Sequence, residues 1–591
     1  MNQESSPKDM LIDWDVPIVM DDGTVLRADI FRPRKPGAYP VLLSHGPYGK
    51  GLSFQEGYPS QWQMMLDEFP EVGRNSSNKY QVWELVDPEK WVPDEYICMR
   101  VDSRGAGRSQ GKLDIFSPRE VQDHYNCIEW AGVQEWSNGK VGLIGISYFA
   151  MCQWQVAGLQ PPHLAAMCVW EGAADFYRDA YRHGGIASAF GLYMWFPNQI
   201  APIQYGMGEN GKRSAVTGEW VSGPETLNEQ ALAANRVDLA NAVLSHRFDD
   251  EYYRSRFPAF EKINVPLLSA GNWGGVGLHL RGNVEGYLAA ASSQKWLEIH
   301  GNSHVSPFYL DDSIAYQKKF LGHFLKGEAT GWDKQPPVEL KVRYPGERFI
   351  SRAENEWPLA RTDWQKFHLC SDRTLSRAQQ QHGGPAISFR SDSKGVTFLT
   401  TPFNTETEIT GPLALKVFLS SQTTDADVFV TLRLFDSVGV ETTFIGANDP
   451  QMPLTFGWLR ASHRKVDPAL SLPYRPYHPH EEAEPMTPGV PVELDVEIWP
   501  TSIVVPPGYM IGLTIGGQDY ENSPHYVARS SMTMRGAAPF LHNDPTDRPR
   551  EVFETDYCLH FDEGRLPYLL LPVIPSRPGD PKIDWIAHLK S

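Results

Sequence analysis

The sequence predicts an α/β domain built on a largely parallel sheet, interrupted by a helical insertion and followed by an all-β domain. Three observations lead to this prediction. Short apolar runs alternate with segments long enough to form a helix over about the first 330 residues. That rhythm breaks between residues 175 and 260, and beyond residue 361 the apolar side chains recur at every second position.

The first region opens with a hairpin and continues with buried strands. Asp22-Gly23 separates two alternating apolar runs within Ile18–Phe31, which is typical of a hairpin turn. The strands expected next are apolar along their length, as parallel strands covered on both faces are: Tyr39–His45, Tyr96–Asp102, Val141–Gly145, Ala165–Trp170, Val265–Ala270 and Trp296–His300. We assign residues 1–174 and 261–345 to one α/β domain.

Two further regions differ from this pattern. Residues 175–260 carry the aromatic group Tyr193–Phe196 and then a polar stretch rich in alanine and asparagine, which indicates an inserted helical cap. In residues 361–591, apolar positions alternate with acidic ones, most clearly over 492–498, and prolines punctuate the intervening loops. This period of two predicts an antiparallel β-sandwich, within which residues 473–491 form a long loop.

Composition excludes several classes of function. The chain has 591 residues and a formal net charge of -18, without a run of basic residues, so nucleic acid and anionic membrane surfaces are expected to repel it. The N-terminal residues lack a signal-peptide pattern, and no stretch reaches the roughly 20 apolar residues of a membrane span. We expect a cytoplasmic protein. Its six scattered cysteines form no CxxC pair, which disfavours a zinc site or a disulfide framework.

A candidate nucleophile lies where a strand meets a helix. Residues 140–150 read Lys-Val-Gly-Leu-Ile-Gly-Ile-Ser-Tyr-Phe-Ala, which places Ser147 in a Gly-x-Ser-x-small pattern after an apolar strand and before a helix at residues 151–159. Small flanking residues permit the sharp turn of a nucleophile elbow, the feature of an α/β-hydrolase that exposes its serine at the sheet edge. The backbone amide of Tyr148 would then face a developing oxyanion.

A serine hydroxyl needs a base, and His304 is the candidate. It follows the last expected strand of the α/β domain through the turn Gly301-Asn302-Ser303, which matches the chain order serine, acid, histidine. His300 lies four residues earlier, at the end of that strand, where a packed structural role is expected.

Several motifs together resemble the cocaine esterase and X-prolyl dipeptidyl peptidase (CocE/NonD) family of serine hydrolases, almost from end to end. They are Met20–Gly23 with Asp29–Pro33, Gly46–Gly49, Asp102–Gly105 with Ser109–Gly111, Glu129-Trp130, Trp136–Gly142, Gly145–Tyr148 and Gly301–His304. The resemblance implies an α/β-hydrolase domain with a helical cap, followed by a jelly-roll domain.

The resemblance also implies roles for individual residues. Ser147 takes the place of the family nucleophile, His304 that of the general base, and Tyr48 that of the tyrosine whose hydroxyl supplies the second oxyanion donor. Asp102 and Arg104 match a family motif too, and we interpret both as structural residues beneath the site.

The acid departs from the family pattern. Where the family shows Gly-x-x-Asp, this chain has Gly271-Asn272-Trp273-Gly274. Glu171, directly after the strand that ends at residue 170, is the preferred replacement, because an acid there can reach the same histidine from an adjacent loop. Asp175, Asn272 or no acid at all remain alternatives.

These residues predict acyl transfer from an ester, amide or short peptide through an acyl-enzyme on Ser147, without metal or organic cofactor. A carboxylesterase or acylase is favoured, and an X-prolyl dipeptidyl-peptidase-like activity is the alternative. An amine substrate would need acidic groups, for which Asp175, Asp179 and Glu209 are candidates. From another class, a catalytically silent binding scaffold would account for the missing acid. The sandwich edges could support a homodimer.

Overall fold

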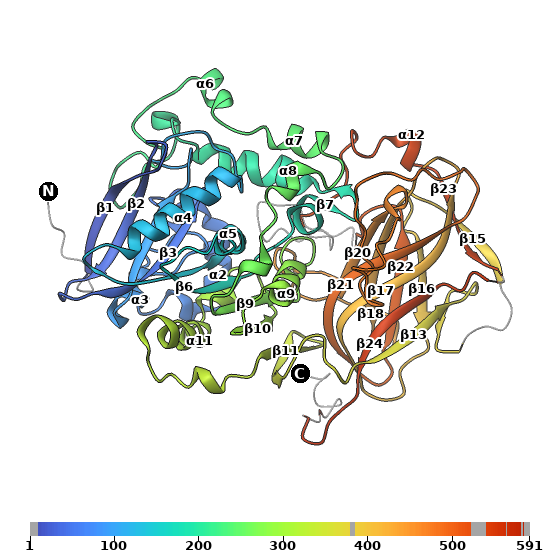
Figure 1. Cartoon of the computed structure of the whole chain (residues 1–591). Helices are drawn as coiled ribbons and strands as arrows, with labels where there is room; N and C mark the ends of the chain where they lie inside the picture. Colours follow the sequence, from blue (N-terminus) through green and yellow to red (C-terminus); the bar gives the residue numbers. More distant parts are fainter. Residues whose placement is uncertain (1–9, 379–383, 522–538, 563, 581–582, 584–591) are drawn as a thin grey trace.

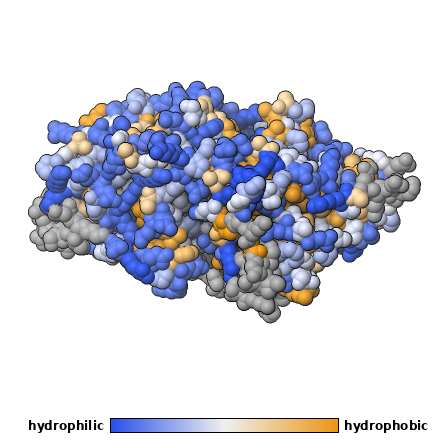
Figure 2. All heavy atoms as spheres, turned by 90° about the horizontal axis from the view of Figure 1, so that it is seen from below, coloured by the Kyte–Doolittle hydropathy of each residue, from blue (hydrophilic) through white to orange (hydrophobic). Residues whose placement is uncertain are grey.

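A computed structural model gives the structure of residues 10–378, 384–521, 539–562, 564–580 and 583. Figure 1 shows an α/β domain at one end of the molecule and a β-rich domain at the other, with the cap helices lying along the α/β domain. The face in Figure 2 is mainly hydrophilic, with small scattered hydrophobic areas. Among the described residues, no helix combines the length and the apolar character that crossing a bilayer requires.

The α/β domain is organised by one ten-stranded sheet. Neighbouring strands are parallel from β4 to β11, and the remaining pairs are antiparallel. In spatial order the strands are β1 (Met10–Val19), β2 (Val25–Pro33), β4 (Ile97–Asp102), β3 (Tyr39–Gly46), β5 (Ser137–Ile146), β6 (Leu164–Trp170), β9 (Leu267–Asn272), β10 (Lys295–His300), β11 (Val338–Tyr344) and β12 (Arg348–Glu354).

Helices on both faces explain why the central strands are apolar throughout. Leu143 and Ile144 are successive residues of β5, so they point to opposite faces of the sheet, and each lies in a different apolar core. Helices α4 (Pro118–Gly132) and α5 (Tyr148–Ala157) contribute to the core of Leu143, and α11 (Asp311–Leu321) contributes to that of Ile144. The other α-helices of this domain are α1 (Phe54–Gly57), α2 (Pro59–Glu68), α3 (Pro88–Trp91), α9 (Leu280–Ala289) and α10 (Ser306–Tyr309).

The regular elements of the segment between β6 and β9 are short, and most of them are helices. It contains two π-helical stretches, Phe176–Tyr181 and Phe190–Ile200, and the small hairpin β7 (Arg182–His183) and β8 (Ile186–Ala187). Its α-helices are α6 (Glu229–Ala234), α7 (Leu239–Ser245) and α8 (Glu251–Arg254). This segment forms one wall of the pocket described below.

The β-rich domain consists of a twelve-stranded sheet that closes on itself. Because β17 pairs with both β21 and β24, the hydrogen-bonded path returns to its start and forms a barrel, whereas the sequence predicted a sandwich. The strands are β13 (Asp363–Leu369), β14 (Thr374–Ser376), β15 (Gly384–Arg390), β16 (Val396–Thr400), β17 (Thr407–Ser421), β18 (Asp427–Phe435), β19 (Glu441–Thr442), β20 (Thr455–Arg460), β21 (Val492–Val505), β22 (Met510–Gly516), β23 (Asp556–Phe561) and β24 (Tyr568–Ile574), with α12 (Arg550–Phe553).

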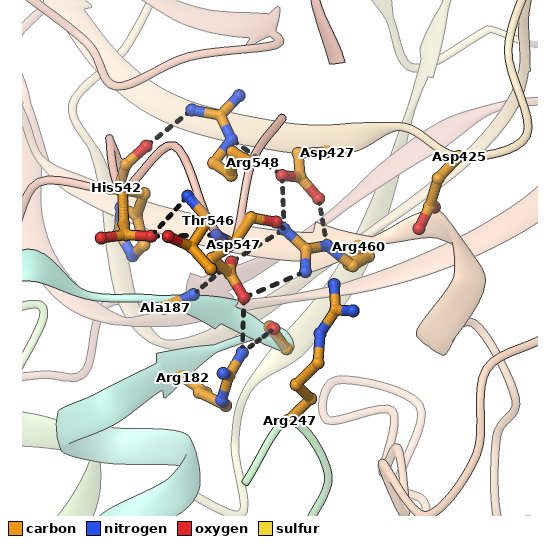
Figure 3. A network of polar contacts seen from close by, with 12 residues as sticks. Arg182, Ala187, Arg247, Asp425, Asp427, Arg460, His542, Thr546, Asp547 and Arg548 are labelled. Carbon is orange, nitrogen blue, oxygen red and sulfur yellow. Dashed lines mark hydrogen bonds and ion pairs between the residues drawn. The ribbon is translucent and has the colours of Figure 1, made fainter. Parts of the chain in front are cut away.

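A buried ionic network joins the cap hairpin to the barrel (Figure 3). Arg182 of β7 pairs with Asp547 at 2.8 Å, and Asp547 also pairs with Arg460 at 2.9 Å. Asp427 in turn accepts from Arg460 and from Arg548, each at 2.8 Å. Arg182, Asp547, Arg460 and Asp427 are buried and Arg548 is partly exposed, so most of these charges interact in a low-dielectric environment and depend on one another.

We predict that Asp547→Asn strongly destabilises the protein. The change leaves the guanidinium of Arg182 without its buried counter-charge, which typically costs about 3 to 5 kcal/mol. Thermal unfolding followed by circular dichroism checks this expectation. Lys35→Gln is the control, because Lys35 pairs with Glu95 on the exposed surface, and it should leave the melting temperature unchanged. Equal melting temperatures for both variants would contradict the role of the network.

Candidate functional site

Ser147 occupies a strained turn between β5 and α5. Its backbone has φ 54° and ψ -114°, a conformation that L-residues seldom adopt and that active sites often retain. The amide of Ser147 donates to the carbonyl oxygens of Trp170 and Glu171, both at 3.1 Å. Gly145 is required nearby, because a Cβ there would lie 2.5 Å from Cβ of Phe149. These constraints hold the serine at the carboxyl edge of the sheet, as a nucleophile elbow does.

Glu171 lies directly after β6 and is fully buried. Its amide donates to the carbonyl oxygen of Ala270 at 2.7 Å, which fixes the backbone against β9. One carboxylate oxygen, Oε2, is 2.7 Å from Nδ1 of His304, and the other, Oε1, is 3.3 Å from Nε2 of His300. Burial disfavours the charge, but His304 and His300 outweigh it and lower the pKa of Glu171 to about 2. The carboxylate is therefore ionised at neutral pH.

His304 is buried and held on both sides by acidic groups. Besides its contact with Glu171, its Nε2 is 3.0 Å from Oε1 of Glu84, and its amide donates to the carbonyl oxygen of Ala447 from the β-rich domain at 2.8 Å. Burial lowers its pKa, but the two carboxylates prevail and raise the pKa of His304 to about 10.

The hydrogen-bond partner of Ser147 is His279, which the sequence analysis missed. Oγ of Ser147 lies 3.0 Å from Nε2 of His279, and none of the hydrogen bonds among the described residues joins Ser147 to His304. His279 precedes α9 in the loop after β9, and its ring stacks on that of His304 with an interplanar angle of 3°. The segment Gly277-Leu278-His279 carries no catalytic motif. His279 is identified as a site residue only because the loop after β9 approaches Ser147 in the folded structure.

Glu84 is the second site residue that the sequence did not indicate. Its backbone has φ 62°, and its carbonyl oxygen accepts from the amide of Ile146 at 3.0 Å, next to the elbow. Burial raises the pKa of Glu84 to about 7, against the opposing effect of His304. Its oxygen Oε2 has no hydrogen-bond partner among the described residues.

The two tyrosines predicted near the nucleophile both lie at the site. The indole N–H of Trp195 donates to the hydroxyl of Tyr48 at 3.0 Å, which leaves the hydroxyl proton free to donate elsewhere. Tyr148 begins α5, and its own hydroxyl donates to the buried carboxyl of Glu120. Burial raises the pKa values of Tyr48 and Tyr148 well above 10, so both phenols stay protonated.

A largely apolar pocket opens over Ser147. Its wall combines residues of the α/β domain, the cap and the β-rich domain, including Tyr48, Phe116, Met151, Tyr181, Trp195 and Asn448. Ser147, His279, His304 and Glu84 line the same pocket. A second cavity shares Trp83, His304 and Asn448 with it and extends towards Met64 and Ile445.

The other predicted site candidates lie elsewhere or have other partners. Asp175 pairs with Arg178 at 2.8 Å, and Asp179 pairs with Arg281 at 2.9 Å. Asn272 donates to Glu171 at 3.1 Å and, among the described residues, makes no hydrogen bond to His279 or His304. Glu209 is exposed in the cap. The suggestion that Asp175, Asp179 and Glu209 form an amine-binding cluster therefore does not fit the geometry, because two are neutralised by arginines and none lines the pocket.

Asp102 and Arg104 stabilise loops beneath the site. The carboxylate of Asp102 accepts from the amides of Lys50 and Arg108 at 2.6 and 2.8 Å. Arg104 pairs with Asp123 at 2.6 Å. Both contacts agree with the structural role given to these residues by the sequence analysis.

One set of side chains in the described residues has the composition of a metal site. Ligand atoms of Glu171, His279 and His304 lie within 4.8 Å of one another. Two imidazoles and a carboxylate suit Zn²⁺. The same three side chains also make hydrogen bonds: His279 to Ser147, His304 to Glu84, and Glu171 to His304.

Comparisons with known proteins match both halves of the chain. Residues 22–306 match the X-Pro dipeptidyl-peptidase family S15, and residues 330–550 match the C-terminal non-catalytic domain of X-Pro dipeptidyl-peptidases. The chain belongs to the cocaine esterase and X-Pro dipeptidyl-peptidase family of serine hydrolases. A CocE/NonD family hydrolase from Staphylococcus aureus has a crystal structure that is 29% identical, covers 96% of this chain and 94% of its own, and superposes with a TM-score of 0.81.

Other similar proteins are more distant. Cocaine esterase of Rhodococcus sp. (strain MB1 Bresler) is 26% identical over 389 residues, which cover 60% of this chain and 61% of that protein. An aminopeptidase from the marine sediment archaeon Thaumarchaeota archaeon is 15% identical with a TM-score of 0.68 over 97% of this chain and 99% of its own, and shows the fold alone. The predicted family and enzyme class are confirmed: the chain is a serine hydrolase that acts on ester or amide bonds, and its family acts on small ester or peptide substrates.

We predict that Glu171→Gln slows the reaction of Ser147 with a fluorophosphonate by about 10²-fold or more, because a neutral amide cannot orient and stabilise a charged imidazole. The labelling rate constant measures this effect. Glu298→Gln is the matched control, since Glu298 contacts His300 at 2.7 Å but neither His279 nor His304. Wild-type labelling of Glu171→Gln would show that the site needs no acid.

Proposed function

We propose that Ser147 is the nucleophile of a two-step acyl transfer, with Glu171 as the acid of the site. The observation that carries the proposal is the 3.0 Å hydrogen bond between Oγ of Ser147 and a buried imidazole, at an elbow facing an apolar pocket. The hydroxyl attacks the substrate carbonyl, a histidine oriented by Glu171 takes its proton, and water hydrolyses the acyl-enzyme. The sequence predicts His304 as that base.

The oxyanion of the tetrahedral intermediate would be bound by the hydroxyl of Tyr48 and the backbone amide of Tyr148. The hydroxyl is protonated and already accepts from Trp195, so its own proton is available. The amide lies at the first residue of α5, where N–H groups and the helix dipole favour negative charge. A phenol and an amide thus supply the two donors that acyl transfer requires.

The pocket favours esters with an apolar acyl group. Phe116 and Tyr148 stack with ring centroids 4.0 Å apart, and Met151, Tyr181 and Trp195 complete a surface that suits an aromatic or branched aliphatic acyl chain. This composition supports a carboxylesterase or acylase.

An X-Pro dipeptidyl-peptidase-like activity is a second candidate, and one observation favours it. Glu84 is a carboxyl group that lines the pocket with Oε2 unpartnered among the described residues, so it could accept a substrate ammonium. The raised pKa of Glu84, about 7, and its contact with His304 weaken that role at neutral pH, because the group must be ionised to bind a cation.

Further predictions accompany the proposal. The β-rich domain is a jelly roll. The chain divides into an α/β domain of residues 1–174 and 261–345, a cap of residues 175–260 and a β-rich domain of residues 361–591. The protein is cytoplasmic, can form a homodimer, and has no nucleic-acid or membrane partner. A barrel of mainly antiparallel strands supports the first. The net charge of -18 supports the exclusion of nucleic acid.

We predict that the enzyme hydrolyses p-nitrophenyl esters of benzoate and branched acids faster than Xaa-Pro p-nitroanilides, since the pocket is apolar and its single lining carboxyl group is engaged by His304. Initial rates for both substrate classes measure the preference, and Ser147→Ala should lose activity on every ester. A faster reaction with the p-nitroanilides would instead establish the peptidase activity. Ester hydrolysis by folded Ser147→Ala would remove Ser147 from the mechanism.

We predict that Tyr48→Phe lowers kcat by about 10²- to 10³-fold with little change in KM, because one oxyanion donor is lost only in the transition state. Steady-state kinetics on the best ester measure the change. Tyr58→Phe is the control: Tyr58 is part of the same aromatic cluster as Tyr48, with ring centroids 6.5 Å apart, but does not line the pocket. Similar losses in both variants would indicate a packing effect.

A further inference from the structure

Two histidines approach the same carboxylate oxygen of Glu171. Nδ1 of His304 lies 2.7 Å from Oε2, and Nδ1 of His279 lies 3.8 Å from that oxygen. The two rings are stacked with their centroids 5.0 Å apart. A serine hydrolase needs one histidine to exchange protons with its nucleophile, so the second histidine requires an explanation.

The ring nitrogens of His304 are both occupied. Nδ1 faces Glu171 and Nε2 faces Glu84 at 3.0 Å, and both partners are acceptors when ionised. A ring that donates from both nitrogens is an imidazolium and has no lone pair for a serine proton. Accepting one would require His304 to give up Glu84, in a buried environment where lost charge-assisted hydrogen bonds are costly.

His279 has the complementary arrangement. Its Nε2 lies 3.0 Å from Oγ of Ser147, and when Nε2 accepts the hydroxyl proton the ring proton lies on Nδ1. Nδ1 is 3.8 Å from Oε2 of Glu171, beyond hydrogen-bonding distance, and has no hydrogen-bond partner among the described residues. That tautomer leaves the Nε2 lone pair available to a general base, and the carboxylate of Glu171 is close enough to stabilise the resulting imidazolium electrostatically. Burial and the neighbouring His304 lower the pKa of His279 to about 3, which keeps its ring neutral.

We propose that His279 is the general base for Ser147, and that His304 and Glu84 form a positioning pair behind it. The inference rests on the proposed function and revises one role within it. In acylation the O–H bond of Ser147 breaks, its proton moves to Nε2 of His279, and Oγ bonds to the substrate carbonyl carbon. His279 then returns that proton to the leaving group as the acyl bond breaks, and water repeats both transfers to release the acid.

The positioning pair removes an electrostatic obstacle to this step. A protonated His279 would lie beside a charged His304, and two stacked cations repel each other. Transfer of the Nε2 proton of His304 to the ionised Oε1 of Glu84, across 3.0 Å, leaves His304 neutral while His279 carries the charge. The pKa of Glu84, raised to about 7 by burial, makes this exchange feasible near neutral pH.

The titratable groups around His279 come from separate loops. Glu171 and His304 face His279 directly, and Glu84 is linked to it only indirectly, by its hydrogen bond to His304. His300 and Glu298 lie behind Glu171, and His300 has a pKa raised to about 9 by these two carboxylates against the effect of burial. A base with a lowered pKa remains competent below the ordinary histidine pKa of about 6.5. A base with the raised pKa of His304 would become active only as the pH approaches about 10.

The test compares full-length variants by the rate constant for fluorophosphonate labelling of Ser147, from about pH 5 to about pH 10. We expect His279→Gln to label about 10² to 10⁴ times more slowly than wild type and His304→Gln only about tenfold more slowly. Glu84→Gln should also change the pH dependence of the labelling rate constant around neutral pH, because an amide cannot take the proton of His304. His163→Gln is the matched control, since His163 pairs with Glu129 and does not line the pocket.

A second measurement distinguishes loss of the general base from misfolding of the variant. Imidazole in solution should restore labelling of His279→Ala, because the deletion leaves space beside the hydroxyl of Ser147, and it should not restore His304→Ala. A loss in His304→Gln as large as that in His279→Gln, or a wild-type rate that rises only towards pH 10, would overturn the proposal. Failure of the proposed function itself would differ, because the wild-type enzyme would then show no adduct on Ser147.

Discussion

The buried carboxylate of Glu171 is the interaction on which the site depends. A fully buried negative charge is costly unless it is paired, and here His300 and His304 contact its two oxygens while His279 approaches one of them. His279 and His304 come from the loops after β9 and β10, and His300 is the last residue of β10, so the pairing fixes the positions of those loops relative to β6. The need to pair the buried charge of Glu171 therefore both orients the histidines and holds the loops after β9 and β10 in place.

The parallel sheet brings these loops together. Strands β5, β6, β9 and β10 are neighbours in space, and their carboxyl ends are followed by Ser147, Glu171, His279 and His304 in turn. Because the strands run in the same direction, all four residues meet at one edge. The family pattern has its acid after the strand that corresponds to β9. Here the acid follows β6, so the carboxylate lies one strand away from the usual position. From this position it contacts two histidine-bearing loops at once.

The β-rich domain takes part in the site and is more than an appendage. The carbonyl oxygen of Ala447 holds the backbone of His304, and Asn448 lines the pocket beside it. Farther away, the buried pair of Arg182 and Asp547 attaches the cap to the same domain. The pocket therefore exists only when the α/β domain, the cap and the barrel are assembled, which explains why its lining residues are spread over the chain.

The sequence by itself determined the strands of the α/β domain, the elbow at Ser147 and an acid after β6, because apolar runs, small residues and chain order are local properties. It also placed Tyr48 and His304 at the site through family motifs. Only the tertiary structure decided which histidine meets Ser147, the engagement of Glu84, and the closure of the barrel through β17 and β24. Ser147 and His279 are 132 residues apart, and no local pattern encodes a contact that arises when two loops pack against a shared charge.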